Sequence, residues 1–311
     1  MSLSVIVITK NEEASIDACL ASVAWADEIV VVDSGSADRT AELCRCRGAA
    51  VHVTDDWPGF GPQKNRALGL AAGDWVLSID ADERVTSALR RELEAAMADP
   101  GENAAFALPR RSRYCGRPMR HGGWWPDYVT RLFRRGRGRF SDDTLHERLI
   151  VEGPVGRLSE PLLHEAFADL EEVLETVNRY STVGAAAMRT QGRRATLATA
   201  IMHGLWSWFS TYVLRAGFLD GREGFLLAVS NAEGTYYRYV KLMLLTTPAP
   251  ASPVAGDHPH PAVPRQGGSP SPLPPPSQGI TLTPPSPVKG DHPHPSLPRQ
   301  GGGIQGGGRT F

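Results

Sequence analysis

The chain has 311 residues, with 33 Lys and Arg against 34 Asp and Glu, a formal net charge of −1 and 41% hydrophobic residues. This composition is typical of a globular protein of one or two domains, and near-neutrality excludes a nucleic-acid binder that relies on bulk positive charge. Beyond Thr247 lie 17 of the 25 prolines and 11 of the 32 glycines. The folded part therefore ends near Thr247 and is long enough for a sizeable core.

Short β-branched segments alternate with helical patterns at the start of the chain. Strands are expected at 5–8, 28–32, 50–54 and 75–79, and helices around 16–23, 41–43 and 63–71. Short apolar strands separated by single helices are the pattern of a parallel sheet covered on both faces. The sequence therefore predicts an α/β fold with a doubly wound, mostly parallel sheet. A further helix is expected to begin with Thr86 or Ser87 as its N-cap.

The pattern changes at about residue 105. The segment 110–139 holds ten arginines and two tryptophans with little periodicity, which favours a loop-rich substrate region. An i, i+3, i+4, i+7 apolar stripe from Leu170 to Tyr180 then predicts an amphipathic helix. Residues 197–214 carry no formal charge, hold several aromatics and are flanked by arginines. This mixture suits a helix at the membrane interface, or equally one packed on the catalytic domain; a membrane-spanning helix is the less favoured reading.

The end of the chain and the cysteines carry little chemistry. The segments 252–268 and 286–302 match at 14 of 17 positions and are dense in proline, so 248–311 is predicted to be a disordered tail that catalysis does not need. The four cysteines fit neither a disulfide framework nor a zinc site, which indicates reduced thiols and a cytosolic setting. No basic region or cleavage site precedes the first apolar segment, so no signal peptide is expected.

Polar residues follow the first two predicted strands. Thr9, Asn11 and Glu12 come after the first, and Asp33, Ser34 and Gly35 after the second. Ligands of open α/β sheets bind at the carboxyl ends of strands, so these residues are expected to face one crevice. Their local alternatives stay open, because Asp33 can simply form a turn and Asp38 can simply cap a helix.

Three carboxylates follow the fourth strand, at Asp80, Asp82 and Glu83. Acids this close repel one another unless a cation neutralises them. In an extended conformation Asp80 and Asp82 point to the same side and can address one ligand. Mg²⁺ or Mn²⁺, held by one or two carboxylates and substrate phosphates, is the expected partner.

The order of these motifs resembles family 2 glycosyltransferases of the GT-A fold. The resemblance rests on Thr9-Lys10-Asn11-Glu12, Asp33-Ser34-Gly35-Ser36, Gln63-Lys64-Asn65 and Asp80-Ala81-Asp82-Glu83, and it covers about residues 4–245. Within that family the chain is most similar to the lipopolysaccharide-core group related to β-1,4-glucosyltransferases. Stretches such as Trp125-Pro126-Asp127-Tyr128 and Asn178-Arg179-Tyr180-Ser181 support this similarity.

The resemblance implies roles for single residues. Thr9, Asn11, Glu12, Asp33, Ser34 and Gly35 would line the nucleotide pocket, Lys64 would lie near the base or diphosphate, and Asp80 near the ribose. Asp82 would bind the metal, with His164 as a further ligand or as a structural histidine. Glu147 stands in the place of the catalytic base, with Asp142 and Asp143 as alternatives. A purely structural role for Glu147, in an ion pair with Arg148 or another arginine, is the other interpretation.

These expectations combine into one prediction. Residues 1–165 form the donor-binding and catalytic domain, with 105–165 as the acceptor region, 166–247 form a helical and possibly membrane-interface region, and 248–311 the tail. The protein is expected to be a metal-dependent, inverting glycosyltransferase, moving a hexose from a nucleotide sugar such as UDP-glucose to an anionic lipopolysaccharide-core acceptor. It would be peripheral on the cytoplasmic face of the inner membrane.

Three alternatives remain open. The acceptor could be a polyprenyl phosphate or a polypeptide. A nucleotidyltransferase would also use such a sheet and a metal, but it would usually have a glycine-rich loop after the first strand, where Thr9-Lys10-Asn11-Glu12 has no glycine. A non-catalytic nucleotide-sugar-binding protein is the third, which the intact Asp80, Asp82 and Glu147 disfavour.

Overall fold

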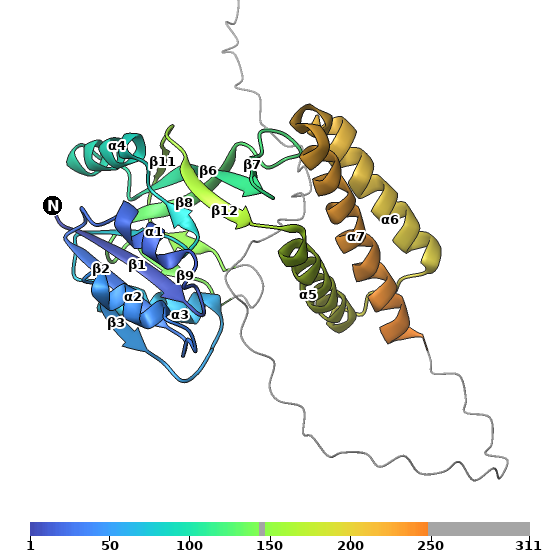
Figure 1. Cartoon of the computed structure of the whole chain (residues 1–311), viewed down its shortest axis with the longest axis horizontal. Helices are drawn as coiled ribbons and strands as arrows, with labels where there is room; N and C mark the ends of the chain where they lie inside the picture. Colours follow the sequence, from blue (N-terminus) through green and yellow to red (C-terminus); the bar gives the residue numbers. More distant parts are fainter. Residues whose placement is uncertain (143–146, 248–311) are drawn as a thin grey trace, which may run out of the picture. The chain divides into compact units, whose positions relative to one another are not determined.

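The computed structural model describes residues 1–142 and 147–247, all within one unit of contacting elements (Figure 1). The predicted disordered tail and the alternative base Asp143 lie outside the described residues. The strands are β1 (Leu3–Thr9), β2 (Glu28–Asp33), β3 (Ala50–Val53), β4 (Trp75–Ser78), β5 (Glu83–Arg84), β6 (Ala105–Tyr114), β7 (Arg117–Pro118), β8 (Asp127–Arg134), β9 (Gly138–Phe140), β10 (Leu149–Val151), β11 (Val155–Arg157) and β12 (Leu162–Phe167). The helices are α1 (Ile16–Ser22), α2 (Thr40–Cys46), α3 (Phe60–Leu70), α4 (Ser87–Ala98), α5 (Leu170–Thr190), α6 (Leu197–Phe209), the π-helical turn η1 (Ser210–Leu214), the 3₁₀ turn η2 (Gly217–Asp220) and α7 (Gly221–Thr246).

The main sheet has the strand order β3-β2-β1-β4-β8-β6-β12-β5, with β7 and β11 paired to β6. The four strands β3, β2, β1 and β4 are parallel, β8 runs antiparallel to both β4 and β6, and β12 is parallel to β6. The predicted α/β fold with a mostly parallel sheet is therefore confirmed. The order of the strands reverses between β1 and β4, and open α/β sheets bind ligands at such a reversal.

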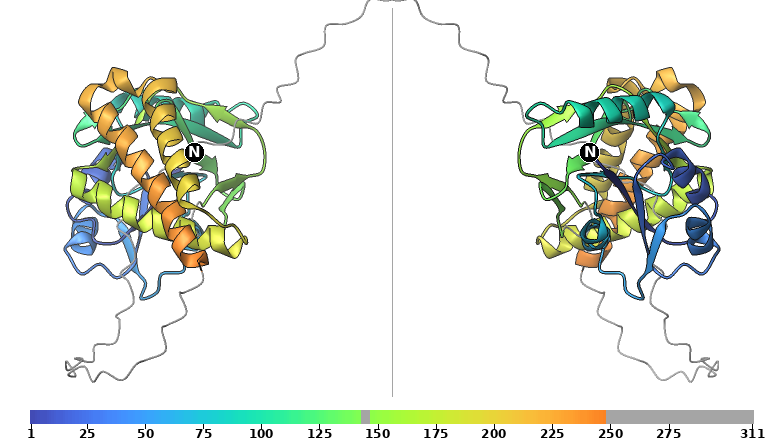
Figure 2. Two further views of the ribbon diagram at one scale, coloured as in Figure 1. Left: turned by 90° about the vertical axis from the view of Figure 1, so that its right-hand side faces the viewer. Right: turned by 90° about the vertical axis from the view of Figure 1, so that its left-hand side faces the viewer.

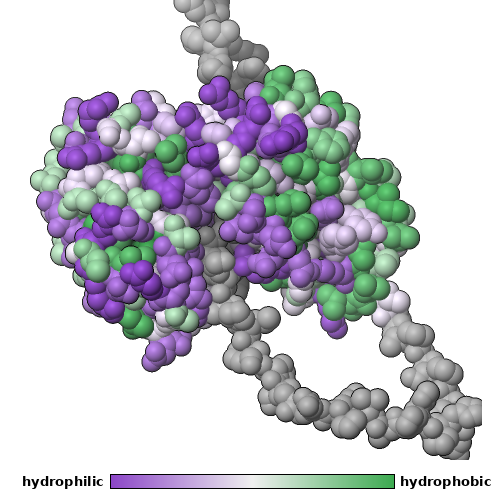
Figure 3. Space-filling model, in the orientation of Figure 1, coloured by the Kyte–Doolittle hydropathy of each residue, from purple (hydrophilic) through white to green (hydrophobic). Residues whose placement is uncertain are grey.

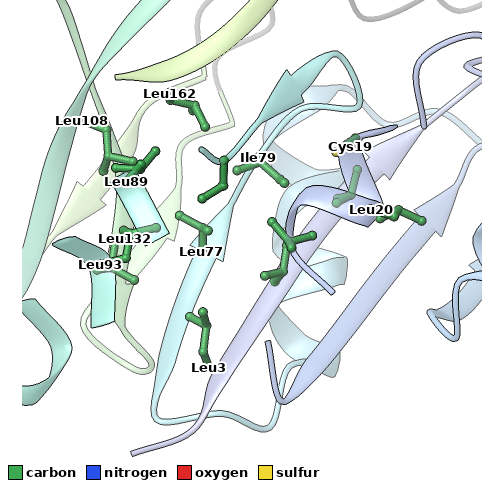
Figure 4. Packing of buried hydrophobic residues seen from close by; sticks show 14 of the residues in the cluster. Leu3, Cys19, Leu20, Leu77, Ile79, Leu89, Leu93, Leu108, Leu132 and Leu162 are labelled. Atoms are coloured by element: carbon green, nitrogen blue, oxygen red, sulfur yellow. The ribbon is translucent and has the colours of Figure 1, made fainter. Parts of the chain in front are cut away.

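The strand β1 is buried on both faces, which explains the apolar run from Val5 to Ile8. Because side chains alternate along a strand, Leu3, Val5 and Val7 join the core under α1 and α4, while Ile6 and Ile8 join the core under α3. Figure 4 shows part of the first core, with the leucines of α4 near those of β6, β8 and β12, and Leu20 of α1 farther along the same layer.

The helix ends follow the local sequence. The hydroxyl of Thr86 accepts a hydrogen bond from the Leu89 amide, so Thr86 is the N-cap of α4. The helix α3 begins at Phe60, three residues before the predicted start at 63. Pro62 is tolerated there because an amide in the first helical turn has no partner within the helix.

The prediction of a loop-rich segment at 110–139 was wrong. Most of it belongs to β6, β7, β8 and the start of β9. The prediction assigned its arginines to a substrate-binding loop region, but Arg110 and Arg131 are buried within strands and paired with carboxylates. A paired arginine no longer needs water, so its charge does not prevent strand formation.

The C-terminal helices pack chiefly on one another. Figure 2 shows α6 and α7 side by side in its left view, and α7 also contacts α5. The Tyr114 hydroxyl lies 2.9 Å from Ser230 Oγ of α7, and the buried Asp220 carboxylate accepts from the amides of Arg120 and His121. The uncharged segment 197–214 is split into α6 and η1, and no helix within the described residues has the length and apolarity to cross a membrane.

Candidate functional site

The turn after β2 is bonded to the end of β1. Thr9 and Asp33 are neighbours in the parallel ladder, and the Thr9 hydroxyl donates to Asp33 Oδ1 at 3.3 Å. The Asp33 carboxylate also accepts from the Ser36 amide at 2.9 Å and from the Ser36 hydroxyl. Gly35 permits this turn with a φ of 71°. Four of the residues predicted to bind the donor, including the adjoining Ser34, therefore lie together at the carboxyl edge of the sheet.

The loop after β1 is fixed to the same turn. Asn11 adopts a left-handed φ of 54°, accepts from the Ala37 amide through Oδ1 at 2.8 Å, and donates its own amide to Ser36 Oγ at 2.8 Å. Asparagine tolerates this backbone region better than most residues. The Glu12 carboxylate accepts from the Ser15 hydroxyl at 2.8 Å, and the side chain is buried. Asn11 thus lies against the turn that follows β2, and much of the polar capacity of Asn11 and Glu12 holds the loops together.

Asp38 takes a structural role. Its carboxylate accepts from the amides of Thr40 at 3.0 Å and Glu13 at 3.2 Å, and from the Thr40 hydroxyl. These bonds organise the chain just before α2, although the N-cap position of that helix is Arg39 and not Asp38.

The middle of α3 connects separate segments through successive side chains. Gln63 Nε2 donates to Ser34 Oγ at 2.9 Å and to Thr54 Oγ1 at 2.8 Å. Asn65 exchanges two hydrogen bonds of 2.9 Å with the backbone of Phe140. Successive residues of a helix point about 100° apart, so one turn can contact β9 and the residues that follow β2 and β3.

Lys64, between these two residues, lies at the centre of the site. Its ammonium is 3.0 Å from Asp80 Oδ1 and 2.9 Å from Glu147 Oε1, and the side chain is 5% exposed. Gly61, one turn earlier in α3, allows the segment carrying Glu147 to approach, because a Cβ at this position would meet the Ser141 carbonyl oxygen at 1.8 Å. An ion pair with an arginine was the structural alternative to a catalytic role for Glu147, and the structure pairs its carboxylate with Lys64.

Asp80 and Asp82 do not lie on an extended strand, so that expectation was wrong; of the three acids after β4 only Glu83 lies in a strand, β5. The Glu83 amide donates to the Asp80 carbonyl at 3.0 Å, which closes a turn. The turn sends the three side chains toward different partners: Asp80 toward Lys64 and Arg131, Glu83 toward Arg131, and Asp82 toward His164. Asp80 and Asp82 therefore have separate environments despite their spacing.

The protein's own cations neutralise two of these acids. Arg131 of β8 contacts both Asp80 and Glu83, the latter at 2.7 Å, and Arg110 of β6 lies 3.9 Å from Glu83 and 2.7 Å from Asp127. From the sequence alone this neutralisation was expected from a bound metal, and neither arginine was expected to provide it. The available signal was an arginine between Val129 and Phe133 in an apolar run, because arginine is seldom buried unless it is paired.

Asp82 is the acid with a carboxylate oxygen still available to accept a hydrogen bond or bind a ligand. Its Oδ2 lies 3.2 Å from His164 Nε2, whereas its buried Oδ1 has no hydrogen-bond partner among the described residues. Ser112 Oγ lies 2.8 Å from His164 Nδ1 and fixes the orientation of the ring. A carboxylate oxygen without a partner beside an oriented imidazole fits a divalent cation, because metal-bound histidines usually have such an outer contact.

Two protein groups alone do not enclose a metal. Within residues 1–142 and 147–247, no cluster of three or more His, Cys, Asp or Glu side chains is arranged to hold one. Mg²⁺ commonly binds through one or two carboxylates together with substrate phosphates and water. The Asp82 and His164 pair suits that kind of shared site.

The charges of the network reinforce one another. Burial raises the pKa of Asp80, but the Arg131 guanidinium and the Lys64 ammonium outweigh burial and hold that pKa well below its usual range. Burial lowers the pKa of Lys64, yet Asp80 and Glu147 raise it overall. For Glu83, burial dominates and raises the pKa. Asp80 and Lys64 are consequently charged at neutral pH.

Tyr180 of α5 has a perturbed phenol. Burial raises the pKa of Tyr180, and the Arg179 guanidinium opposes this rise. Arg179 lies 5.2 Å above the ring of Tyr180. Asp142, an alternative base, is exposed.

Known proteins resemble the chain over most of its described length. A family model described as glycosyl transferase family 2 matches residues 4–155. The lipopolysaccharide core biosynthesis glycosyltransferase LpsC of Rhizobium meliloti is 32% identical over 257 residues, covering 77% of this chain and 93% of that protein. An uncharacterized glycosyltransferase of Rickettsia bellii is 28% identical over 256 residues, covering 78% and 87%.

Two solved structures give weaker overall superpositions. S. aureus TarS, residues 1–349, is 17% identical with a TM-score of 0.41, covering 78% of this chain and 90% of that one. Glucosyl-3-phosphoglycerate synthase from Mycobacterium tuberculosis, in complex with Mn²⁺, UDP and its product, is 28% identical with a TM-score of 0.31, covering 36% and 44%.

Proposed function

The chain belongs to glycosyl transferase family 2, and we propose that it moves a hexose, with inversion, from a nucleoside-diphosphate sugar to a lipopolysaccharide-core acceptor. The observation that carries the proposal is the position of Lys64, which joins Asp80 to Glu147. It puts the candidate base next to the edge where nucleotides bind in open α/β sheets. We propose UDP-glucose as the donor, because the sequence motifs resemble those of the group related to β-1,4-glucosyltransferases.

Glu147 is the proposed base. Its Oε1 is held by Lys64, and its side chain keeps 22% exposure, so an acceptor can reach it. As the acceptor oxygen attacks the anomeric carbon, the carboxylate takes the hydroxyl proton, and the bond to the diphosphate breaks on the opposite face of the sugar. Lys64, within reach of both carboxylates, is placed to attract the negatively charged diphosphate.

Asp82 and His164 are the proposed metal ligands. Mg²⁺ or Mn²⁺ bound by them would offset the negative charge that builds up on the departing diphosphate. Ser112 would keep Nε2 of His164 directed at the ion through its contact with Nδ1. Asp80 is committed to Lys64 and Arg131, so its proposed contribution near the ribose is to hold these two cations in place.

The proposed acceptor region at 105–165 offers contacts for an anionic sugar. Arg111 stacks on Trp125 at 4.9 Å and Arg157 on Tyr128 at 4.9 Å. Guanidinium groups recognise phosphate or carboxylate, and aromatic faces pack on sugar rings. Because the acceptor is a glycolipid, and because the four free cysteines suit a reducing compartment, we place the reaction at the cytoplasmic face of the inner membrane.

A donor screen tests the first step. Each nucleotide sugar is added with Mn²⁺ and the shift in melting temperature is recorded, since a ligand at 100 times its Kd adds about 2.7 kcal/mol to stability. UDP-glucose should stabilise the protein most. Stabilisation by nucleoside triphosphates alone would instead favour a nucleotidyltransferase.

Matched variants test the assignments. Glu147→Gln should bind the donor normally and lose about 10²–10⁴-fold in kcat, as expected for loss of a general base. Asp142→Asn is the control and should transfer at the wild-type rate. Asp82→Asn should abolish metal-dependent transfer. An unchanged kcat in Glu147→Gln would move the base to Asp142 or Asp143, and donor binding without transfer or hydrolysis in the wild type would indicate a binding protein.

A further inference from the structure

The helix α6 exposes its large side chains and buries its small ones. Ala200 and Gly204 are buried, and Gly204 packs so closely on α7 that a Cβ there would lie 3.2 Å from Tyr236 Cβ. The outward side carries six large apolar residues that are 40–66% exposed, which we call the α6 face: Leu197, Ile201, Met202, Leu205, Trp206 and Phe209. A helix facing water normally has the reverse arrangement. In Figure 3 hydrophobic colour gathers over α6 and the adjoining part of α7.

The apolar surface continues past the end of α6. Val213 and Leu214 in η1 and Phe218 and Leu219 in η2 are 41–59% exposed. Contiguous apolar surface of this kind marks an interaction site on a protein that is otherwise polar. The charged residues around this apolar surface indicate which kind of partner it binds.

The charged residues between α5 and the exposed side chains of η2 are all arginines, and the acids that follow them, Asp220 and Glu223, are buried. Residues 176–219 contain five arginines, Arg179, Arg189, Arg193, Arg194 and Arg215, and no Asp or Glu. Arg189, Arg193 and Arg194 are exposed just before α6 begins, and Arg215 follows η1 at the other end. A symmetric contact between two copies would bring these like charges together, whereas anionic lipid headgroups would neutralise them.

The length of the segment limits how it meets a bilayer. α6 has 13 residues before the π-helical turn, while a spanning helix needs about 20. Interfacial helices combine apolar and aromatic residues at the acyl boundary with basic residues at headgroup depth. We infer that the α6 face lies in the interface of an anionic membrane, with Leu205 and Trp206 at the acyl boundary and the flanking arginines on phosphate. This inference does not depend on the reaction proposed above.

Sedimentation of the full chain with vesicles tests the inference. The protein should bind vesicles of phosphatidylethanolamine and phosphatidylglycerol, and bind phosphatidylcholine vesicles much less. The variant Leu205→Ser/Trp206→Ser should lose about tenfold or more in partitioning, because two large apolar side chains no longer enter the lipid. Both side chains are 61% exposed, so the fold should tolerate the change. The control Val53→Ser, at a 52% exposed position of β3, should bind like the wild type.

A charge variant separates the two contributions. Arg193→Gln/Arg194→Gln should weaken binding to the anionic vesicles by about fivefold per arginine and leave the weak binding to phosphatidylcholine unchanged. Equal vesicle binding by the wild type and Leu205→Ser/Trp206→Ser would overturn the inference. So would a wild-type dimer in analytical ultracentrifugation that separates in this variant while neither protein binds vesicles. Donor binding is measured separately, so failure here leaves the proposed reaction untouched.

Discussion

Replacing Lys64 by methionine tests whether the buried charge network holds the site together. The substitution keeps the length of the side chain and removes the ammonium that lies 3.0 Å from Asp80 and 2.9 Å from Glu147. Loss of one partner from a buried ion pair costs about 3–5 kcal/mol. We expect about 3 kcal/mol, at the lower end of that range, because Asp80 keeps Arg131 and the Glu147 side chain is 22% exposed to water.

Urea unfolding followed by circular dichroism measures this loss, and the melting temperature should fall by about 6–12 °C. Arg66→Met is a matched control on the same helix. It removes an ion pair to Asp56 whose side chains are 39% and 62% exposed, so the loss should stay below about 1 kcal/mol. If Lys64→Met were as mild as the control, the reasoning about the buried network would be refuted.

Three further predictions follow from the same contacts. The pKa of Asp80 is depressed in the folded state, so its contribution to the free energy of unfolding is fully present above the unfolded pKa of about 3.9 and is lost as pH falls further. The urea concentration at the midpoint of unfolding should therefore decrease below about pH 4. This decrease should be less steep in Lys64→Met. Ser112→Ala should weaken Mn²⁺ affinity about 10–100-fold by calorimetry; an unchanged affinity would remove His164 from the proposed metal site. Gly61→Ala should lower kcat because the Ser141 carbonyl must move. At Gly69 an added Cβ would meet no atom of the described residues within 4 Å apart from its own helix backbone and chain neighbours, so Gly69→Ala should gain about 0.5–1 kcal/mol in stability and transfer normally.

Much of the fold could be predicted from the sequence because it rests on local patterns. The apolar runs of β1, β2 and β4 have the period and length of strands buried on both faces, and Thr86 signals the start of α4. The segment 110–139 was misjudged for a physical reason. A strand can carry a buried arginine only when a carboxylate from elsewhere in the chain reaches it, and local sequence contains no sign of such a partner.

The candidate site divides in the same way. Asp80, Asp82 and Lys64 could be selected from the sequence because each lies in a motif beside a strand end. Their partners could not, since Arg131 lies 51 residues beyond Asp80 and Glu147 lies 83 residues beyond Lys64. The sequence predicted an extended backbone after β4. In the structure the Glu83 amide donates a hydrogen bond to the Asp80 carbonyl, and the backbone forms a turn there.

The sequence by itself determined the class of the sheet, the edge at which polar residues collect and the family to which the motifs point. These follow from hydrophobic period and from the rule that parallel strands end at a common edge. Only the tertiary structure decided which acid is neutralised by which cation. Because Lys64 and Arg131 take Asp80 and Glu83, Asp82 alone of the three acids keeps a buried oxygen without a hydrogen-bond partner among the described residues. Such pairings depend on distances between segments remote in sequence, which no local pattern records.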